Sequence, residues 1–309
     1  MQKKNKKRLT VVYVIALVFI FVIGISIIVI KSPLYNEKIV DKSGKIAVIP
    51  LKGPISMENG DGDFFSRGAI GSGSVINFIE AAASDNEIKG IILNINSPGG
   101  TVVASKEIVD AIKKVDKPVV ALIREVGASG AYWIASASDY IVADPLSVTG
   151  SIGVLGSYLE FSDLFSRYGV KYQDIKTGDY KDLGNPYKDL TPTDKNILVG
   201  KLQIIHNYFA DDVSKNRGRD LKKYANGLFY IGTEAKEIGL VDELGGKEAA
   251  INAIKRLSDI EDYELVLYQK DLTFFDLLSR ITEDFGFRIG EGFGSTITSQ
   301  NDDFNIALK

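Results

Sequence analysis

The sequence of 309 residues contains no cysteine and only one histidine, His206. The absence of cysteine excludes disulfide bonds, thiolate nucleophiles and cysteine metal sites. One histidine cannot supply a histidine-rich zinc site, and it permits a Ser-His-Asp triad only if His206 itself is the base. Gly246-Lys247 is followed by glutamate, so no P-loop is present, and neither H-E-x-x-H nor a strand-linked G-x-G-x-x-G occurs. We therefore expect no metal and no cofactor.

Acidic residues are absent from the N-terminus and in excess elsewhere. Residues 1–31 contain six of the 37 Lys and Arg residues and no Asp or Glu. The remaining 31 basic residues face 40 acidic ones, so residues 32–309 have a net charge of −9. A surface of that sign offers no electrostatic attraction for a phosphate backbone, and we expect no nucleic-acid partner.

The N-terminus has the pattern of a membrane anchor. A basic head, residues 1–8, precedes an uncharged apolar run, residues 9–30. As a helix this run would be about 33 Å long, enough to cross the hydrocarbon core of a bilayer. The positive flank predicts a cytoplasmic N-terminus, with the body outside the cytoplasm of a single-pass cell-membrane protein. A cleaved signal peptide is the alternative, but the run is longer than usual and no A-x-A-like cleavage site follows.

After a polar juxtamembrane linker, residues 31–44, apolar runs typical of buried strands alternate with stretches of helical spacing. The predicted strands are residues 45–51, 90–95, 118–123, 140–142, 171–175 and 263–268. Helices are predicted around residues 75–82 and 104–115, from Ser129, over 193–217, from Thr233 and Lys247, and around 274–281. This order predicts an α/β fold of βαβ units, with a mainly parallel sheet covered on both faces. We place the folded domain at residues 45–289 and a flexible tail at 290–309.

Two segments that follow predicted strands carry small residues suited to acyl-transfer chemistry. Gly99-Gly100 follows a strand and precedes a helix, so its N–H groups could form an oxyanion hole; an ordinary Pro-Gly-Gly turn is the alternative. Ser129 lies between small residues at a strand-to-helix turn, similar to a nucleophile elbow; alternatively, it caps the helix.

A third segment, residues 177–186, contains Lys181 in a loop punctuated by glycine. A lysine in such a loop is ordinarily a solvated surface residue. If Ser129 is a nucleophile, however, it needs a base, and His206 lies in a long helix beside apolar positions. A desolvated lysine can supply that base, because burial favours the neutral amine.

Taken together and in order, these segments resemble the signal peptide peptidase A family of bacterial membrane-anchored proteases. The segments are NSPGG, ASGAYWIASASDYIVAD, TGSIGV, KTGDYKDLGNP and GLVDELGG, and the similarity covers residues 45–257. It implies a Clp-protease/crotonase-like fold. It also implies that Ser129 is the nucleophile, Lys181 the general base, Gly100 with Gly99 the oxyanion hole, and Ser151 a hydroxyl that orients the lysine. The sequence departs from the family at Ala131, where a second glycine is frequent, and at Asn185, where serine is common.

The resemblance further implies a function and an assembly. The expected substrates are signal peptides left in the membrane and other short unfolded peptides. Because the chain has the length of the family's single-unit form, we expect self-association into a homo-oligomeric ring, in which a neighbour could contribute to each site. Two alternatives remain: a non-catalytic membrane scaffold on the same fold, and a crotonase-type enzyme that acts on acyl-CoA.

Overall fold

The computed structural model describes residues 17–23, 43–59 and 68–269 of the chain. The chain divides into two units, Met1–Ser43 and Gly44–Lys309. In the first unit, residues 17–23 form a helix of exposed apolar side chains. The basic head and the rest of the predicted membrane span lie outside the described residues. No helix within the described ranges is both long enough and apolar enough to cross a membrane.

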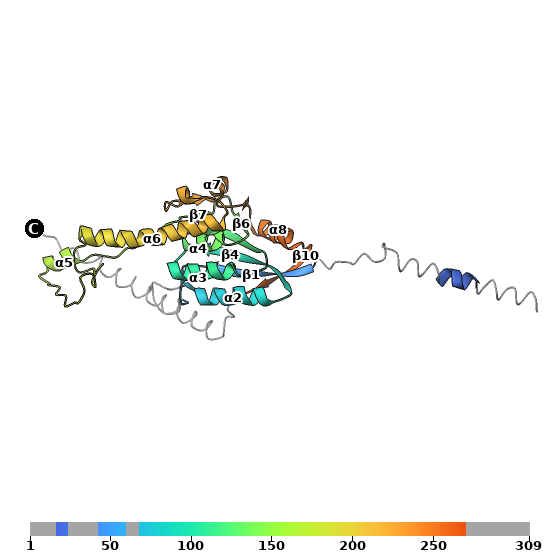
Figure 1. Ribbon diagram of the computed structural model, residues 1–309, viewed down its shortest axis with the longest axis horizontal. Helices are drawn as coiled ribbons and strands as arrows, with labels where there is room; N and C mark the ends of the chain where they lie inside the picture. The colour runs from blue at the N-terminus through green and yellow to red at the C-terminus, as the bar shows by residue number, and fades with distance from the viewer. Residues whose placement is uncertain (1–16, 24–42, 60–67, 270–309) are drawn as a thin grey trace, which may run out of the picture. The chain divides into compact units, whose positions relative to one another are not determined.

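A mainly parallel sheet forms the centre of the second unit (Figure 1). Its strands, in spatial order, are β10 (Asp262–Leu267), β1 (Ser43–Lys52), β4 (Ile88–Ser97), β5 (Val119–Ala128), β6 (Tyr140–Ala143) and β9 (Glu243–Leu244). Neighbouring strands from β1 to β9 run parallel. The end of β5 also pairs in parallel with β7 (Val148–Gly150), to which β8 (Phe229–Ile231) is antiparallel. A separate parallel pair consists of β2 (Ile55–Ser56) and β3 (Ile70–Gly71).

Helices cover both faces of this sheet, as the sequence predicted. The helices are α2 (Ser72–Ser84), α3 (Val102–Ile112), α4 (Gly130–Ser136), α5 (Ser162–Arg167), α6 (Pro192–Asn216), η1 (Lys222–Tyr224), α7 (Gly232–Glu237) and α8 (Lys247–Ser258). Successive side chains of β4 point to opposite faces. Ile91 and Leu93 therefore lie in the core formed with α2, α3 and α4, whereas Ile92 lies in the core formed with α8.

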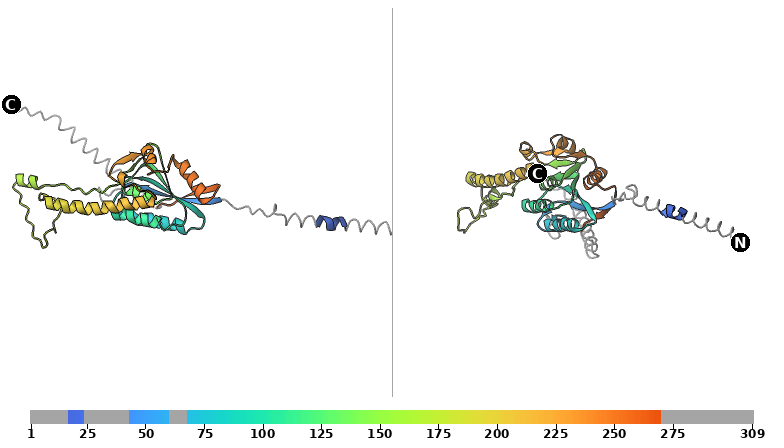
Figure 2. Two further views of the ribbon diagram at one scale, coloured as in Figure 1. Left: turned by 45° about the horizontal axis from the view of Figure 1, so that its top comes forward. Right: turned by 45° about the vertical axis from the view of Figure 1, so that its right-hand side comes forward.

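The long helix α6 extends beyond the sheet. A capping box at Thr191 begins the helix, and such a cap stabilises it by about 1 kcal/mol. Only Phe209, Ala210 and Val213 of this helix are buried, all of them in its second half. Figures 1 and 2 show the first half leading away from the sheet toward α5. We call residues 155–191, which connect β7 to α6 and include α5, the arm.

The arm contains the clearest error of the sequence prediction. Residues 171–175 form no strand, and Ile175 is completely exposed. An apolar run forms a buried strand only where a sheet is available to pair with it, and the arm lies away from the sheet. The other five predicted strands are confirmed as β1, β4, β5, β6 and β10. The predicted helix at residues 274–281 and the tail at 290–309 lie outside the described residues.

Candidate active site

Ser129 is the hinge residue between β5 and α4. Its backbone has φ 54° and ψ −126°, a conformation that residues other than glycine rarely adopt. Strain of this kind is typical of functional turns, and the strand-turn-helix setting is that of a nucleophile elbow. Ser129 precedes α4 without a side-chain capping bond to it. The structure therefore gives no support to the interpretation of Ser129 as a helix cap.

The predicted glycine turn lies directly against Ser129. A Cβ atom at Gly99 would lie 2.7 Å from the backbone nitrogen of Gly130 and 3.0 Å from the Cβ atom of Ser129. In turn, a Cβ atom at Gly130 would lie 3.3 Å from the nitrogen of Gly100. Only residues without side chains permit this approach, so the glycines are required by the contact between the two turns.

The N–H group of Gly100 is directed away from its neighbouring strand. Ile55 donates to the carbonyl oxygen of Gly99 at 2.9 Å, and its own oxygen accepts from Thr101 at 2.9 Å. In such a parallel bridge, the polar groups of the middle residue, Gly100, face the other side. Within the described part of the chain, no acceptor is recorded for the N–H of Gly100 or of Gly130. Two free donors beside a serine can stabilise an oxyanion.

Sequence analysis missed Gly130 as a donor. In nucleophile elbows, the N–H of the residue after the nucleophile contributes to the oxyanion hole. The identification of Ser129 as a candidate elbow could therefore have indicated Gly130 as well.

Ser151 also lies beside Ser129. The parallel pairing of β5 with β7 aligns Ala128 with Gly150, and the Ser129 N–H donates to the Gly150 oxygen at 2.8 Å. Ser151 follows Gly150 and has φ 50°, so two strained serines end neighbouring strands. The carboxyl ends of β4, β5 and β7 thus gather four of the five predicted site residues: Gly99, Gly100, Ser129 and Ser151.

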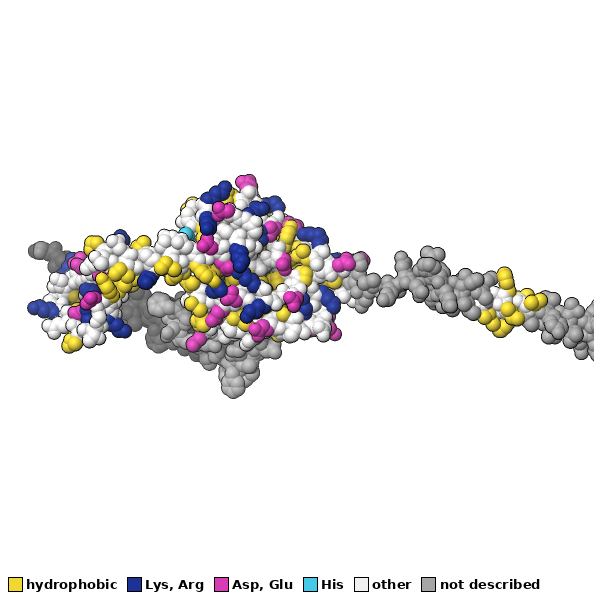
Figure 3. All heavy atoms as spheres, in the orientation of Figure 1, with side chains coloured by type: hydrophobic (Ala, Val, Ile, Leu, Met, Phe, Trp, Pro, Cys, Tyr) yellow, Lys and Arg dark blue, Asp and Glu magenta, His cyan; other side chains and the backbone are white. Residues whose placement is uncertain are grey.

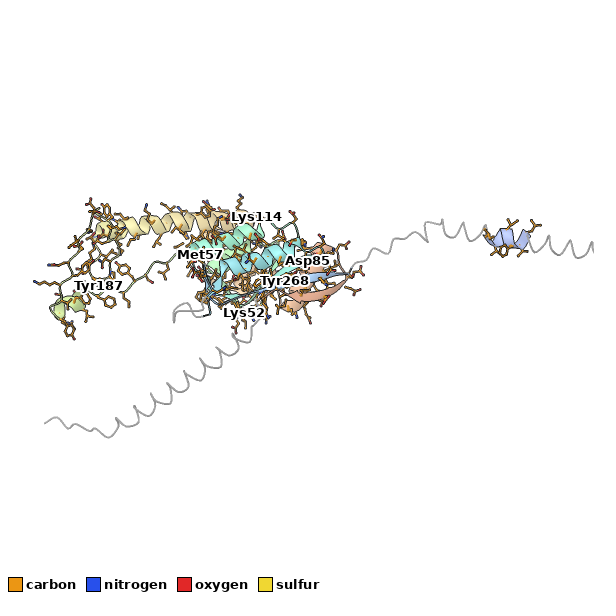
Figure 4. All side chains as sticks on the ribbon, turned by 90° about the horizontal axis from the view of Figure 1, so that it is seen from below. Lys52, Met57, Asp85, Lys114, Tyr187 and Tyr268 are labelled. Atoms are coloured by element: carbon orange, nitrogen blue, oxygen red, sulfur yellow. The ribbon has the colours of Figure 1, made fainter. Side chains whose placement is uncertain are left out.

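The fifth predicted site residue, Lys181, does not lie beside Ser129 in the single chain. It lies in the arm, its side chain is exposed, and its N–H donates to Gly178 at 3.2 Å. No hydrogen bond joins it to Ser129 among the described residues. Figure 4 shows Tyr187, from the same loop, far from Met57 and Lys114 of the sheet region. The loop follows no strand, so the rule that brings strand ends together does not apply to it.

His206 is held by the backbone of a neighbouring segment. Its Nε2 atom lies 2.7 Å from the carbonyl oxygen of Ala225, and its Nδ1 atom lies 3.3 Å from Nε2 of Gln203. Nothing in the described part of the chain links the ring to Ser129. This geometry assigns His206 to the attachment of α6 rather than to a triad.

A partly buried carboxylate fixes the helix that carries the elbow. Asp212 of α6 accepts from the Trp133 indole of α4 at 2.8 Å and from Lys113, which follows α3, at 2.7 Å. The Trp133 ring also stacks on Phe209 with centroids 4.6 Å apart. Burial works to raise the pKa of Asp212, but the bonds from Lys113 and Trp133 outweigh it, and the pKa lies below its ordinary value.

An apolar cleft of about 350 Å³ opens beside the first turn of α3, just after Gly100. Its walls come from three helices, and the lining side chains are Val102, Val103, Lys106, Glu107, Trp133, Ile204, Ile205 and Tyr208. Figure 3 shows hydrophobic side chains gathered along the boundary between α6 and α3. The cleft can accept an apolar side chain about one helical turn from Ser129 along α4.

Comparisons with known proteins agree with this geometry. The profile of Peptidase family S49 matches residues 111–261, and the profile of Clp protease matches residues 71–142. The second match supports a Clp protease-like α/β fold with a mostly parallel sheet.

Relatives are similar over most of the chain. A protein of Methanocaldococcus jannaschii named "Putative protease" is 32% identical over 302 residues, which cover 94% of this chain and 95% of that protein. A "Putative signal peptide peptidase SppA" of Enterococcus faecium is 32% identical, covering 75% of this chain and 69% of that protein. "Protease 4" of Haemophilus influenzae is 33% identical, covering 69% of this chain and 35% of that protein.

Proposed function

The chain belongs to peptidase family S49, and on this premise we propose that it is a serine endopeptidase with a Ser/Lys dyad. Ser129 is the nucleophile and Lys181 the general base. The observation that carries the proposal is the strained Ser129 turn packed against Gly99-Gly100, with two free N–H donors beside it. A scaffold protein would have no need of a strained serine at this position.

The chemistry is acyl transfer. The Ser129 hydroxyl attacks a peptide carbonyl as its proton passes to the neutral amine of Lys181. The N–H groups of Gly100 and Gly130 stabilise the tetrahedral oxyanion. The lysine then returns the proton to the leaving amine, and the same group activates the water that hydrolyses the acyl-enzyme. In this proposal Ser151, which lies beside the nucleophile, orients the lysine.

A second copy of the chain completes the site. A lysine acts as a base only when it is neutral, and burial favours the neutral form. Lys181 is exposed in one chain, and the arm that carries it presents exposed apolar side chains such as Leu155, Tyr168 and Ile175. Packing of the arm on a neighbour would bury both. Identical head-to-tail contacts close into a ring, which would also exclude folded proteins from the sites.

The substrates are peptides rich in apolar residues, such as signal peptides released into the membrane. The apolar cleft lined by α3, α4 and α6 suits their side chains, and the Enterococcus relative is named for activity on signal peptides. The basic head and the uncharged run at residues 9–30 support a cell-membrane location, with the peptidase domain outside the cytoplasm.

A fluorophosphonate probe tests this proposal. The purified full-length chain should gain one covalent adduct, which peptide mapping places on Ser129, because the probe reacts with activated serines. The Ser84→Ala chain, which lacks an exposed serine at the end of α2, should still be labelled at Ser129. An unlabelled folded chain, or an adduct elsewhere, would contradict the assignment. A membrane-impermeant form of the probe should label Ser129 on intact protoplasts, and labelling only after lysis would contradict the proposed orientation.

A further inference from the structure

One carboxylate ties together the two sides of the loop that carries Lys181. Asp182 lies 2.5 Å from the Lys176 ammonium through Oδ1 and 2.5 Å from the Lys188 ammonium through Oδ2. Lys176 also lies 3.2 Å from Asp174. The Asp182 side chain is only 10% exposed, whereas most of the arm around it is open to solvent. Its two ion pairs therefore close the loop between residues 176 and 188.

Backbone hydrogen bonds define the conformation inside this closure. Lys181 donates to Gly178 at 3.2 Å, and Asn185 donates to the oxygen of Asp182 at 3.0 Å, forming two consecutive turns. Beyond them, Tyr187 stacks on Phe165 of α5 with ring centroids 5.3 Å apart. The loop is thus held on both sides and at its base, with the Lys181 side chain exposed.

Lys181 has no counter-ion among the residues that the structure describes. The hydrogen bond from Lys176 and then the ion pair with Lys188 hold the pKa of Asp182 well below its ordinary value, so this carboxylate remains ionised. Both of its oxygens face those two lysines, and no ion pair of Lys181 is recorded in the described part of the chain. A carboxylate paired with Lys181 would favour the charged ammonium, which cannot accept a proton.

We propose that Asp182 is a positioning residue for Lys181. With Lys176 and Lys188 it fixes the loop that presents the base, and those two lysines occupy its carboxylate so that Lys181 stays unpaired. The inference rests on the proposed function, because it concerns the same base.

The arm contains other ionisable groups near the loop. Asp179 lies on the same loop, and Asp189 accepts from Ser162 of α5. The further ionisable groups on the segments that pack around the loop are Asp163, Arg167, Lys171, Tyr172, Asp174, Tyr180 and Tyr187. Among the described residues, only Asp182 joins the two sides of the loop through ion pairs, so its loss is the one expected to displace Lys181.

The test measures kcat and kcat/KM of the full-length chain against pH with a fluorogenic apolar peptide. Asp182→Asn should lower kcat about tenfold while KM stays within about twofold, because misplacement of a base affects the transition state more than substrate binding. The acidic limb of kcat/KM should move to lower pH, since a negative charge near the base is lost. Asp182→Glu should restore part of kcat.

Freeing the Asp182 carboxylate from its lysine partners should move the acidic limb of kcat/KM to higher pH. Replacing both Lys176 and Lys188 with glutamine frees the Asp182 carboxylate to pair with Lys181, and the acidic limb should rise by about half a pH unit or more. Adding Asp182→Asn to that chain should reverse the rise. Asp179→Asn removes another carboxylate of the same loop, two residues before Lys181, for which no ion pair is recorded in the described part of the chain, and kcat should stay within about twofold.

Equal losses of kcat in Asp182→Asn and Asp179→Asn, or an acidic limb at the wild-type pH in every variant, would overturn the inference. A folded Lys181→Ala chain with wild-type kcat would instead overturn the proposed function, and that result comes from a separate variant.

Discussion

Replacing Lys181 with alanine is expected to lower kcat by at least about a thousandfold while the chain stays folded, and Ser129→Ala should do the same. Without the lysine, no group accepts the proton of the attacking hydroxyl. Because the two residues act in one step, the double variant should be no slower than either single variant. Steady-state hydrolysis of an apolar peptide, with circular dichroism as the check on folding, provides the measurement.

Two control variants separate this dyad from its alternatives. Lys171→Ala removes another exposed lysine of the arm and should leave kcat nearly unchanged. His206→Ala removes the contact with Ala225 and should also leave turnover largely intact. Turnover by the wild-type chain should fall at acidic pH, because a protonated Lys181 cannot act as a base. Substantial turnover by Lys181→Ala, or a large loss in His206→Ala, would contradict the assignment of the base.

Gly100→Ala is expected to lower kcat by about a hundredfold or more through displacement of an oxyanion donor. A Cβ atom at Gly100 would lie 1.9 Å from the carbonyl oxygen of Ile55, so the turn must shift away from β2. That shift moves the N–H group that faces Ser129. The peptide hydrolysis assay gives kcat, and the thermal melting curve reports how much of the loss reflects unfolding.

Gly73→Ala is the matched control for this change. Gly73 lies in α2, and a Cβ atom there would meet no heavy atom within 4 Å. Alanine is favoured over glycine by up to about 1 kcal/mol in a helix, and Gly73 is the second residue of α2, so this variant should be at least as stable as the wild type. A folded Gly100→Ala chain with wild-type kcat would show that the oxyanion donors lie elsewhere.

The nucleophile and the oxyanion hole could be predicted from the sequence, because the carboxyl ends of parallel strands lie at one edge of their sheet. Gly99, Gly100 and Ser129 all follow long apolar runs that form β4 and β5. Because β4 and β5 are parallel neighbours, this rule brings the three residues to the same edge of the sheet. The three-residue strand β7 is too short to give a period, so Ser151 was indicated by the family resemblance rather than by its own pattern.

The position of Lys181 could not be predicted in this way. Apolar residues at 170–175 have the composition of a strand, but composition does not specify whether the partner surface belongs to the same chain or to another. In the structure, Val170, Tyr172 and Ile175 are exposed on the arm. The same reasoning applies to α6, in which Phe209 and Val213 are buried but no residue of the first half is.

Because Lys181 lies on the exposed arm, away from Ser129 of its own chain, the central claim is that Ser129 of one chain works with Lys181 of another. Subunit mixing tests this claim most directly. Ser129→Ala and Lys181→Ala chains, each inactive alone, are combined under conditions of reassembly, and mixed assemblies are verified by native mass spectrometry. Random mixing of equal amounts should restore about one quarter of the wild-type sites, because some interfaces pair an intact serine with an intact lysine. Verified mixed assemblies that stay inactive would contradict the shared site.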